Sequence, residues 1–82
     1  MSDALSKISR SLLYEQVAER TRELIRSESL WGSYLPAERE LAAKFGVSQV
    51  TVRRGLELLV RDGLIVRRRG QGTRVLSKPQ RR

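Results

Sequence analysis

Apolar residues recur at helical spacing along the first third of the chain. Between Leu12 and Ser27 an apolar or small residue returns every three or four positions, and charged residues fill the positions between. The apolar side consists of Leu13, Tyr14, Val17, Ala18, Thr21, Leu24 and Ile25. Ser11 stands where a hydroxyl can cap a helix N-terminus. The pattern predicts a first helix over residues 12–27, preceded by a flexible arm over residues 1–10.

A second, shorter helix is predicted after Pro36, whose fixed φ suits helix entry. Residues 30–36 mix large apolar side chains with Gly and Pro, which is typical of a packed connection. We expect Trp31 to fill the edge of the core there, the alternative being an exposed recognition role. The predicted apolar face of the second helix consists of Leu41, Ala42 and Phe45. Gly46 ends this helix.

A third helix is predicted between a serine cap and a glycine stop. Ser48 can cap its N-terminus, and Val47 and Val52 stand at the two positions of a hydrophobic staple that fixes the angle to the preceding helix. Gly63 suits the residue just past the C-terminus. The predicted buried stripe contains Val52, Leu56, Leu59 and Val60, with Gly55 beside it to permit close helix contact. The predicted outward positions are Gln49, Val50, Thr51, Arg53, Arg54, Glu57 and Arg61.

Two short β-prone runs follow the third helix. Residues 64–69 and 73–76 are rich in apolar, β-branched and basic side chains, and the turn Gly70-Gln71-Gly72 separates them. Three helices followed by a hairpin predict a mainly α fold with a small β-hairpin, the winged helix-turn-helix. We expect this domain to occupy residues 11–76. Residues 77–82 contain a proline and no core residue, so we expect a linker or tail.

The composition allows one small domain that depends on its apolar core. A chain of 82 residues with 39% apolar and 32% charged residues can fold around a single core. Cysteine and histidine are both absent, which excludes disulfides, thiolate zinc sites and the commonest general base. No apolar run approaches the roughly 20 residues of a membrane span or the length of a secretory signal. We therefore expect a cytoplasmic protein without a cofactor, a metal site or a membrane contact.

The net charge of +8 is concentrated at the C-terminal end. Residues 1–63 carry ten Lys/Arg and nine Asp/Glu, whereas residues 64–82 carry seven Lys/Arg and no acid. These seven are Arg67, Arg68, Arg69, Arg74, Lys78, Arg81 and Arg82. Such a basic arm suits a polyanion, because each neutralised phosphate releases counterions. For any one of these arginines the alternative is protection of an edge strand against aggregation.

The predicted third helix has the form of a reader of the DNA major groove. A helix of this diameter fits that groove with its first turn deepest. Arg53 can bond guanine or a phosphate, and Gln49 matches the geometry of adenine. Ser48 and Thr51 can bond a phosphate or a base edge. The alternative is a merely solvated helix face, but the cap, the staple and the basic hairpin occur together in the required order.

No catalytic group of residues is apparent, so we expect no enzyme. Glu38, Glu40 and Glu57 are the only acids near the predicted DNA face, and none has a partner at a spacing that suggests catalysis. Glu40 and Lys44 are better explained as an i,i+4 surface pair. Two other binding functions remain open. One is a winged-helix protein-interaction module that contacts an acidic partner; the other is RNA binding, which lacks an aromatic stacking surface here.

Four motifs carry a family resemblance. They are Leu35-Pro36-Ala37-Glu38-Arg39-Glu40-Leu41-Ala42, Phe45-Gly46-Val47-Ser48, Thr51-Val52-Arg53 and Gly70-Gln71-Gly72-Thr73. Together they resemble the N-terminal domain of a GntR-family bacterial transcription regulator, over about residues 13–75. The resemblance implies sequence-specific binding of double-stranded DNA, usually for repression by operator occupancy. It also implies a homodimer on a palindromic operator, with the third helix in the major groove and the wing tip in the adjacent minor groove.

The resemblance also implies particular contact residues. By motif position these are Arg39, Ser48, Gln49, Thr51, Arg53 and Gly70. With their neighbours in the reading helix and the wing, the expected DNA-binding set is Arg39, Ser48, Gln49, Thr51, Arg53, Arg54, Arg69, Gly70 and Gln71. Gln49 stands where the family very often has arginine, which shifts the expected contact from guanine towards adenine or a bridging water. Arg54 stands where an acid or a neutral polar residue is common, and Gly55 where alanine is common.

Members of this family normally continue into a larger C-terminal domain that binds a small metabolite and carries most of the dimer contact. Since the chain stops just past the expected wing, we expect the effector domain to be absent. The free chain is then expected to be a monomer or a weak dimer, and a small-molecule effector would act only through the absent domain. The motifs Phe45-Gly46-Val47-Ser48 and Val66-Arg67-Arg68 suggest the HutC-like subgroup, whose effector domain resembles a chorismate lyase.

Overall fold

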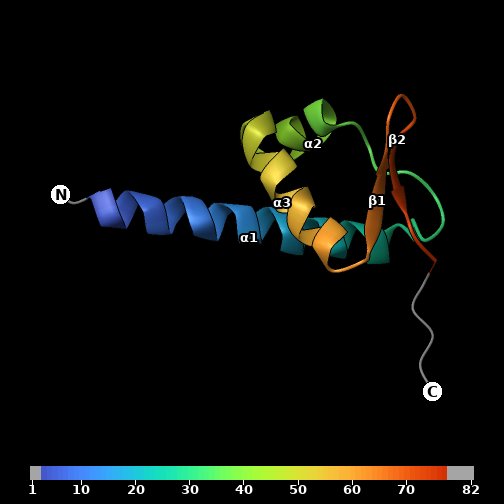
Figure 1. Ribbon diagram of the computed structural model, residues 1–82, viewed down its shortest axis with the longest axis horizontal. Coiled ribbons are helices and arrows are strands. Elements are labelled where there is room, and N and C mark those ends of the chain that lie inside the picture. The colour runs from blue at the N-terminus through green and yellow to red at the C-terminus, as the bar shows by residue number, and fades with distance from the viewer. Residues whose placement is uncertain (1–2, 78–82) are drawn as a thin grey trace, which may run out of the picture.

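The computed structural model describes residues 3–77 and contains three helices followed by a two-stranded hairpin (Figure 1). In chain order the elements are α1 (Asp3–Ser27), α2 (Glu38–Phe45), α3 (Gln49–Arg61), β1 (Ile65–Arg68) and β2 (Gly72–Val75). The two strands are antiparallel, with Ile65 opposite Val75 and Arg68 opposite Gly72. This arrangement confirms the predicted winged helix-turn-helix, with the hairpin as the wing. The predicted tail lies outside the described residues from position 78 onward.

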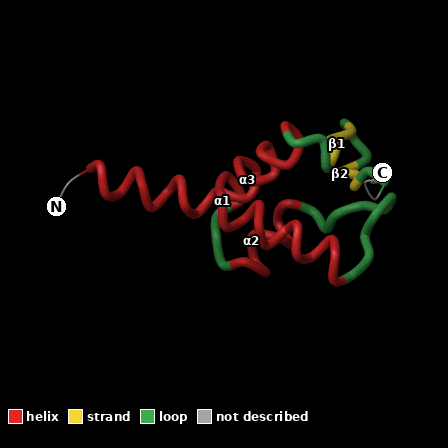
Figure 2. The backbone as a smooth tube through the Cα atoms, turned by 90° about the horizontal axis from the view of Figure 1, so that it is seen from below, coloured by secondary structure: helices red, strands yellow, loops and turns green. Residues whose placement is uncertain are grey.

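The first helix begins earlier than the apolar pattern predicted. α1 starts at Asp3 rather than Leu12, so Ser11 lies inside the helix and does not cap it, and residues 3–10 of the expected arm are helical. Both backbone views show this part of α1 projecting beyond the other elements (Figures 1 and 2). Leu5, Ile8 and Leu12 stand at i, i+3 and i+7, so the helical spacing of apolar residues does continue into this segment. Each added residue also gains a hydrogen bond once the helix is nucleated. The flexibility expected of this arm stays a prediction.

The core forms where α1 and α3 pack together, closed by one residue from each strand and by α2. Its buried apolar members are Val17, Ala18, Leu24, Ile25, Leu35, Leu41, Ala42, Val52, Leu56, Leu59, Ile65 and Val75. Thr21 is also buried, and its hydroxyl donates to the carbonyl oxygen of Val17 at 2.7 Å, so no polar group is left unpaired there. Two predicted core positions are wrong, because Leu13 and Val60 are each 39% exposed.

Gly55 brings α3 very close to α1. A methyl group at this position would lie 2.6 Å from Cγ1 and 2.8 Å from Cβ of Val17, and 3.0 Å from the carbonyl oxygen of Tyr14. These atoms are a branched side chain near its root and a helix backbone, neither of which can move aside easily. The prediction that the missing side chain permits close helix contact is therefore confirmed.

The turn between α2 and α3 has the predicted caps. Gly46 adopts a left-handed φ of 70° and ends α2, and Val47 packs partly buried against the core that contains Val52. Ser48 caps α3, its Oγ accepting the backbone N–H of Thr51 at 3.1 Å. These features fix where the exposed first turn of α3 begins.

At the other end of α2, the backbone N–H of Ala37 donates to Glu40 Oε1 at 3.2 Å. Among the described residues Glu40 thus caps its own helix and forms no ion pair with Lys44, contrary to the expected surface pair.

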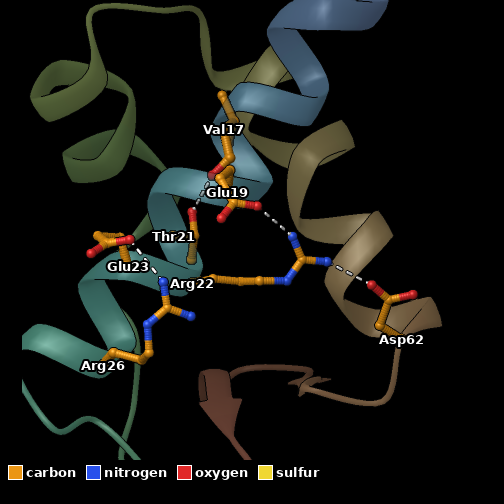
Figure 3. A network of polar contacts seen from close by, with 7 residues as sticks. All are labelled: Val17, Glu19, Thr21, Arg22, Glu23, Arg26 and Asp62. Atoms are coloured by element: carbon orange, nitrogen blue, oxygen red, sulfur yellow. Dashed lines mark hydrogen bonds and ion pairs between the residues drawn. The ribbon is translucent and has the colours of Figure 1, made fainter.

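An ion-pair network ties α1 to the C-terminal end of α3 (Figure 3). The guanidinium of Arg22 donates to Asp62 at 2.7 Å and to Glu19 at 3.2 Å. Asp62 is the C-cap residue of α3, followed by Gly63 with the left-handed φ of 77° predicted for a helix stop. The network is largely exposed, so it orients the two helices more than it stabilises them.

The connection between α1 and α2 forms a third, short edge of the wing. The N–H of Leu35 donates to the carbonyl of Thr73 at 2.9 Å, and the N–H of Val75 donates to the carbonyl of Ser33 at 2.7 Å. Trp31 is partly buried against the core, which confirms its predicted packing role. These bonds join β2 to the segment that leads into α2, so β2 is held by this segment as well as by β1.

We expect Gly55→Ala to lower the free energy of unfolding by about 1 kcal/mol. Overpacking against Val17 costs about 1–3 kcal/mol, against a gain of about 1 kcal/mol in helix propensity. Urea denaturation measures the change. Val17→Ala in the same background is the control, because it removes Cγ1, the atom that would lie nearest to the added methyl group, while Cβ of Val17 remains. A Gly55→Ala protein that unfolds at the same or a higher urea concentration than the wild type would contradict the close contact.

Candidate nucleic-acid interface

The first turns of α3 present an exposed polar face with one apolar residue on it. Gln49, Arg53 and Arg54 are exposed, as predicted, whereas Thr51, which was also predicted to be exposed, is half-buried. Val50 is 54% exposed, which is unusual for a valine in a domain whose other valines are mostly packed. Its exposure follows from the helical period, since the buried stripe continues through Val52 on the opposite side. A polar face with an exposed methyl-bearing side chain matches the base edges of a major groove.

Two of the predicted contact residues are hydrogen-bonded to each other. The hydroxyl groups of Ser48 and Thr51 are 2.9 Å apart, in addition to the cap bond between Ser48 Oγ and the N–H of Thr51. This pair fixes both side chains at the N-terminus of α3. Because the backbone N–H groups of a helix N-terminus attract anions, the capped end is a suitable place for a phosphate.

Glu38 joins the reading helix to the wing. Its Oε1 accepts hydrogen bonds from Nε and Nη2 of Arg53, both at 3.3 Å, and its Oε2 accepts one from Nη2 of Arg67. The three residues lie in α2, α3 and β1. This contact could not be predicted from the sequence, because partners separated by 15 and 29 residues leave no periodic signal. Its only trace in the sequence is that Glu38 is one of few acids near the basic elements.

Arg54, which follows Arg53 in α3, has a different partner. The guanidinium carbon of Arg54 lies 5.5 Å from the ring centroid of Tyr14 on α1, a cation–π distance. Successive helix residues point about 100° apart, so Arg53 faces the wing while Arg54 leans over α1. The two arginines were predicted together, but they sit in separate surroundings.

Arg39 and Gln49 line one hollow beside the wing. Its walls are Leu35, Pro36, Ala37, Glu38, Arg39, Gln49, Gly72 and Thr73. Arg39 is exposed in the first turn of α2, and Gln49 is the first residue of α3. The structure therefore brings together two of the predicted residues that are ten positions apart in the chain, at the entrance between the helix and the hairpin.

The wing tip is an exposed basic turn. Arg69, Gly70 and Gln71 connect the strands and are all exposed, and the N–H of Gln71 donates to the carbonyl of Arg68 at 2.9 Å. Gly70 has a φ of 74°, which favours glycine there. Arg68 and Arg69 form no ion pair with any described residue, whereas Arg67 is bound to Glu38. Within the wing, Arg68 and Arg69 are thus more available to phosphates than Arg67 is.

Residues 3–77 show neither a membrane-spanning helix nor a metal site. No helix in this range is long and apolar enough to cross a membrane. In the same range no group of three or more acidic side chains could hold a metal ion.

Comparison with known proteins places this geometry in a family. The sequence profile described as "Bacterial regulatory proteins, gntR family" matches residues 13–75. The chain is 41% identical over 66 residues to the probable transcriptional regulator PhnF of Escherichia coli (strain K12), a match that covers 80% of this chain and 27% of PhnF. It is 44% identical over 69 residues to the HTH-type transcriptional repressor NagR of Bacillus subtilis (strain 168), covering 83% of this chain and 28% of NagR. The chain thus spans little more than a quarter of the length of these curated relatives.

A solved protein–DNA complex has the same fold. The crystal structure of AraR(DBD) in complex with operator ORE1 superposes with a TM-score of 0.70 at 36% sequence identity, covering 77% of this chain and 78% of that chain. The superposition and the profile together assign residues 13–75 to a winged helix-turn-helix DNA-binding domain of transcription regulators.

The wing arginines are expected to differ in their share of the salt dependence of DNA binding. Arg69→Ala should reduce the slope of log K against log salt concentration by about 0.9, because one phosphate contact is lost. Arg67→Ala should change the slope much less, since that guanidinium is already ion-paired with Glu38. Fluorescence anisotropy with a labelled duplex over a series of KCl concentrations measures both slopes. Equal reductions for the two variants would contradict the assignment of free and paired cations.

Proposed function

The chain belongs to the GntR family of bacterial regulatory proteins, and on that premise we propose that it represses transcription by occupying a palindromic operator as a homodimer. The observation that carries the proposal is the pairing of an exposed, capped first turn of α3 with a basic wing tip beside it. A helix so presented can enter the major groove while the wing reaches the adjacent minor groove.

The proposed base contacts come from the first turns of α3. Arg53 would bond the O6 and N7 acceptors of a guanine, and Gln49 would bond the N6 and N7 of an adenine. Val50, which the sequence analysis did not assign to the interface, would contact the C5-methyl group of a thymine. These three side chains specify sequence, whereas the capped N-terminus and the wing position the domain on the phosphates.

The wing and α2 would supply the sequence-independent contacts. Arg39 lies beside Gln49 at the hollow, where it can reach a phosphate. Arg69, Gly70 and Gln71 would enter the minor groove, because their turn is narrow, exposed and positively charged. Arg54 would reach the backbone from the α1 side, with Tyr14 supporting its guanidinium.

Repression, dimerisation and effector control form the wider part of the proposal. NagR, one of the relatives, is described as a repressor, and bound protein blocks a promoter simply by occupying it. Two-fold symmetry of a dimer requires a palindromic site. A metabolite would act through the C-terminal domain that family members normally carry, and the free chain would be a monomer or a weak dimer. Its place of action would be the cytoplasm, where bacterial DNA is found, and its membership of the HutC-like subgroup stays a prediction.

Selection from a random duplex library at fixed salt tests the function. We expect a palindromic consensus whose half-site centres lie about one helical turn, or a multiple of it, apart. Footprinting on that consensus should protect both half-sites. Salt-sensitive binding to every duplex without a consensus would contradict the proposal and favour the alternative of a basic module that contacts an acidic protein partner.

Arg53→Ala is expected to cost about 1–3 kcal/mol in binding to the selected consensus, because a bidentate base contact is lost. Binding to a scrambled duplex should fall much less. Competition titrations measure both affinities, and Arg61→Ala in the last turn of α3 is the matched control on the same helix. Equal losses on the two duplexes would mean that Arg53 holds only a phosphate.

A further inference from the structure

We propose that Glu38 is a positioning residue for base recognition, which aims Arg53 at its base and couples that arginine to the wing. The inference rests on the proposed function and goes beyond it, because Glu38 itself need not contact DNA. An acid in the middle of a DNA-binding surface repels phosphates, so its presence there calls for a compensating role.

The hydrogen-bond geometry selects which edge of Arg53 remains open. A guanidinium has a side edge formed by Nε and Nη2 and an end edge formed by Nη1 and Nη2. Glu38 takes the side edge, since both of its bonds to Arg53 come from Nε and Nη2. Among the described residues Nη1 has no partner, and the Arg53 side chain remains 50% exposed. The end edge is therefore left for the O6 and N7 acceptors of a guanine.

Glu38 is itself held in place. It is the first residue of α2, where the positive end of the helix dipole favours a carboxylate, and its side chain is only 24% exposed. Its second oxygen is bound to Arg67 on β1, so the carboxylate cannot rotate away from Arg53 without breaking a second ion pair. An arginine side chain is otherwise mobile, and fixing it before DNA arrives reduces the entropy that binding must overcome.

The same contact links the two halves of the interface. Arg53 lies on the helix that would enter the major groove, and Arg67 lies on the wing that would reach the minor groove. Through Glu38 the three charges sum to one positive charge rather than two, which weakens attraction to any phosphate backbone. The carboxylate thus lowers affinity for random DNA while it favours the correct base, which raises the ratio of specific to non-specific binding.

Glu38→Gln tests the inference, because it keeps the shape of the side chain and removes its charge. The matched control is Glu40→Gln, which removes one charge from the same helix while glutamine can still cap it. The probes are the consensus duplex selected by the wild-type chain, a scrambled duplex, and the consensus with each guanine replaced in turn by 7-deazaguanine, which lacks the N7 acceptor. Affinity for each duplex and the thermal unfolding midpoint are measured for every variant.

We expect Glu38→Gln to lower the ratio of consensus to scrambled affinity about tenfold, as for loss of one base contact, with scrambled binding unchanged or tighter. The 7-deazaguanine position that penalises the wild type should penalise Glu38→Gln less. Glu40→Gln should keep the wild-type ratio. In an Arg53→Ala background, Glu38→Gln should leave the ratio unchanged, because the residue that it positions is gone.

Three outcomes would overturn the inference. If Glu38→Gln bound the consensus and the scrambled duplex more tightly by the same factor, Glu38 would only repel phosphates. A lower unfolding midpoint with an unchanged ratio would mean that it only stabilises the fold. An undiminished effect in the Arg53→Ala background would place its action elsewhere. Failure of the proposed function is distinct from these results, since the wild-type chain would then select no consensus at all.

Discussion

The close packing of α3 against α1 is the constraint on which the rest of the structure depends. Eighty-two residues without disulfides can support only a small core, and α3 must use one side for that core while it offers the other side to a partner. Gly55 allows the two helices to approach until Val17 fills the space of its missing side chain. The direction of Arg53, Gln49 and Val50 follows from that contact, because a rotation of α3 would bury them.

Local features of this fold could be predicted from the sequence, because each depends on residues that are close in the chain. The Gly46 turn, the Ser48 cap and the Gly63 stop are of this kind, and all three are present in the structure. The start of α1 was predicted too late, although Leu5 and Ile8 continue the helical spacing that leads to Leu12, because Ser11 also suits the N-cap position. Val60 was predicted to be buried but is exposed. Burial at the edge of a helix face depends on how far the neighbouring elements extend, and the spacing of residues in the sequence does not reveal this.

In the candidate site, too, features that depend on residues close in the chain could be predicted, and contacts between distant residues could not. Gln49, Arg53 and the wing-tip residues could be placed on the correct elements from the helical period and the turn glycines. The side chains that pair with these residues could not be predicted from the sequence. Arg53 and Arg54 are adjacent and chemically identical, yet one is bound to Glu38 and the other stacks on Tyr14. Only the packing of α2, the wing and α1 around α3 decides which arginine meets which partner.

The unpaired positive charges of the described residues at the wing tip and the ion-paired arginine on α3 lie on different parts of the surface. The wing tip carries Arg68 and Arg69 without acidic partners among the described residues, so it attracts phosphates regardless of sequence. Next to α3, Glu38 reduces the charge of Arg53 and Arg67 from two positive charges to one, so the orientation of Arg53 matters more there. Because Arg67 shares that carboxylate, displacement of the wing would also disturb Arg53. Under the proposed function, a duplex that fits only the major-groove helix or only the wing would therefore disturb the ion pairs that link Arg53 to Arg67 through Glu38.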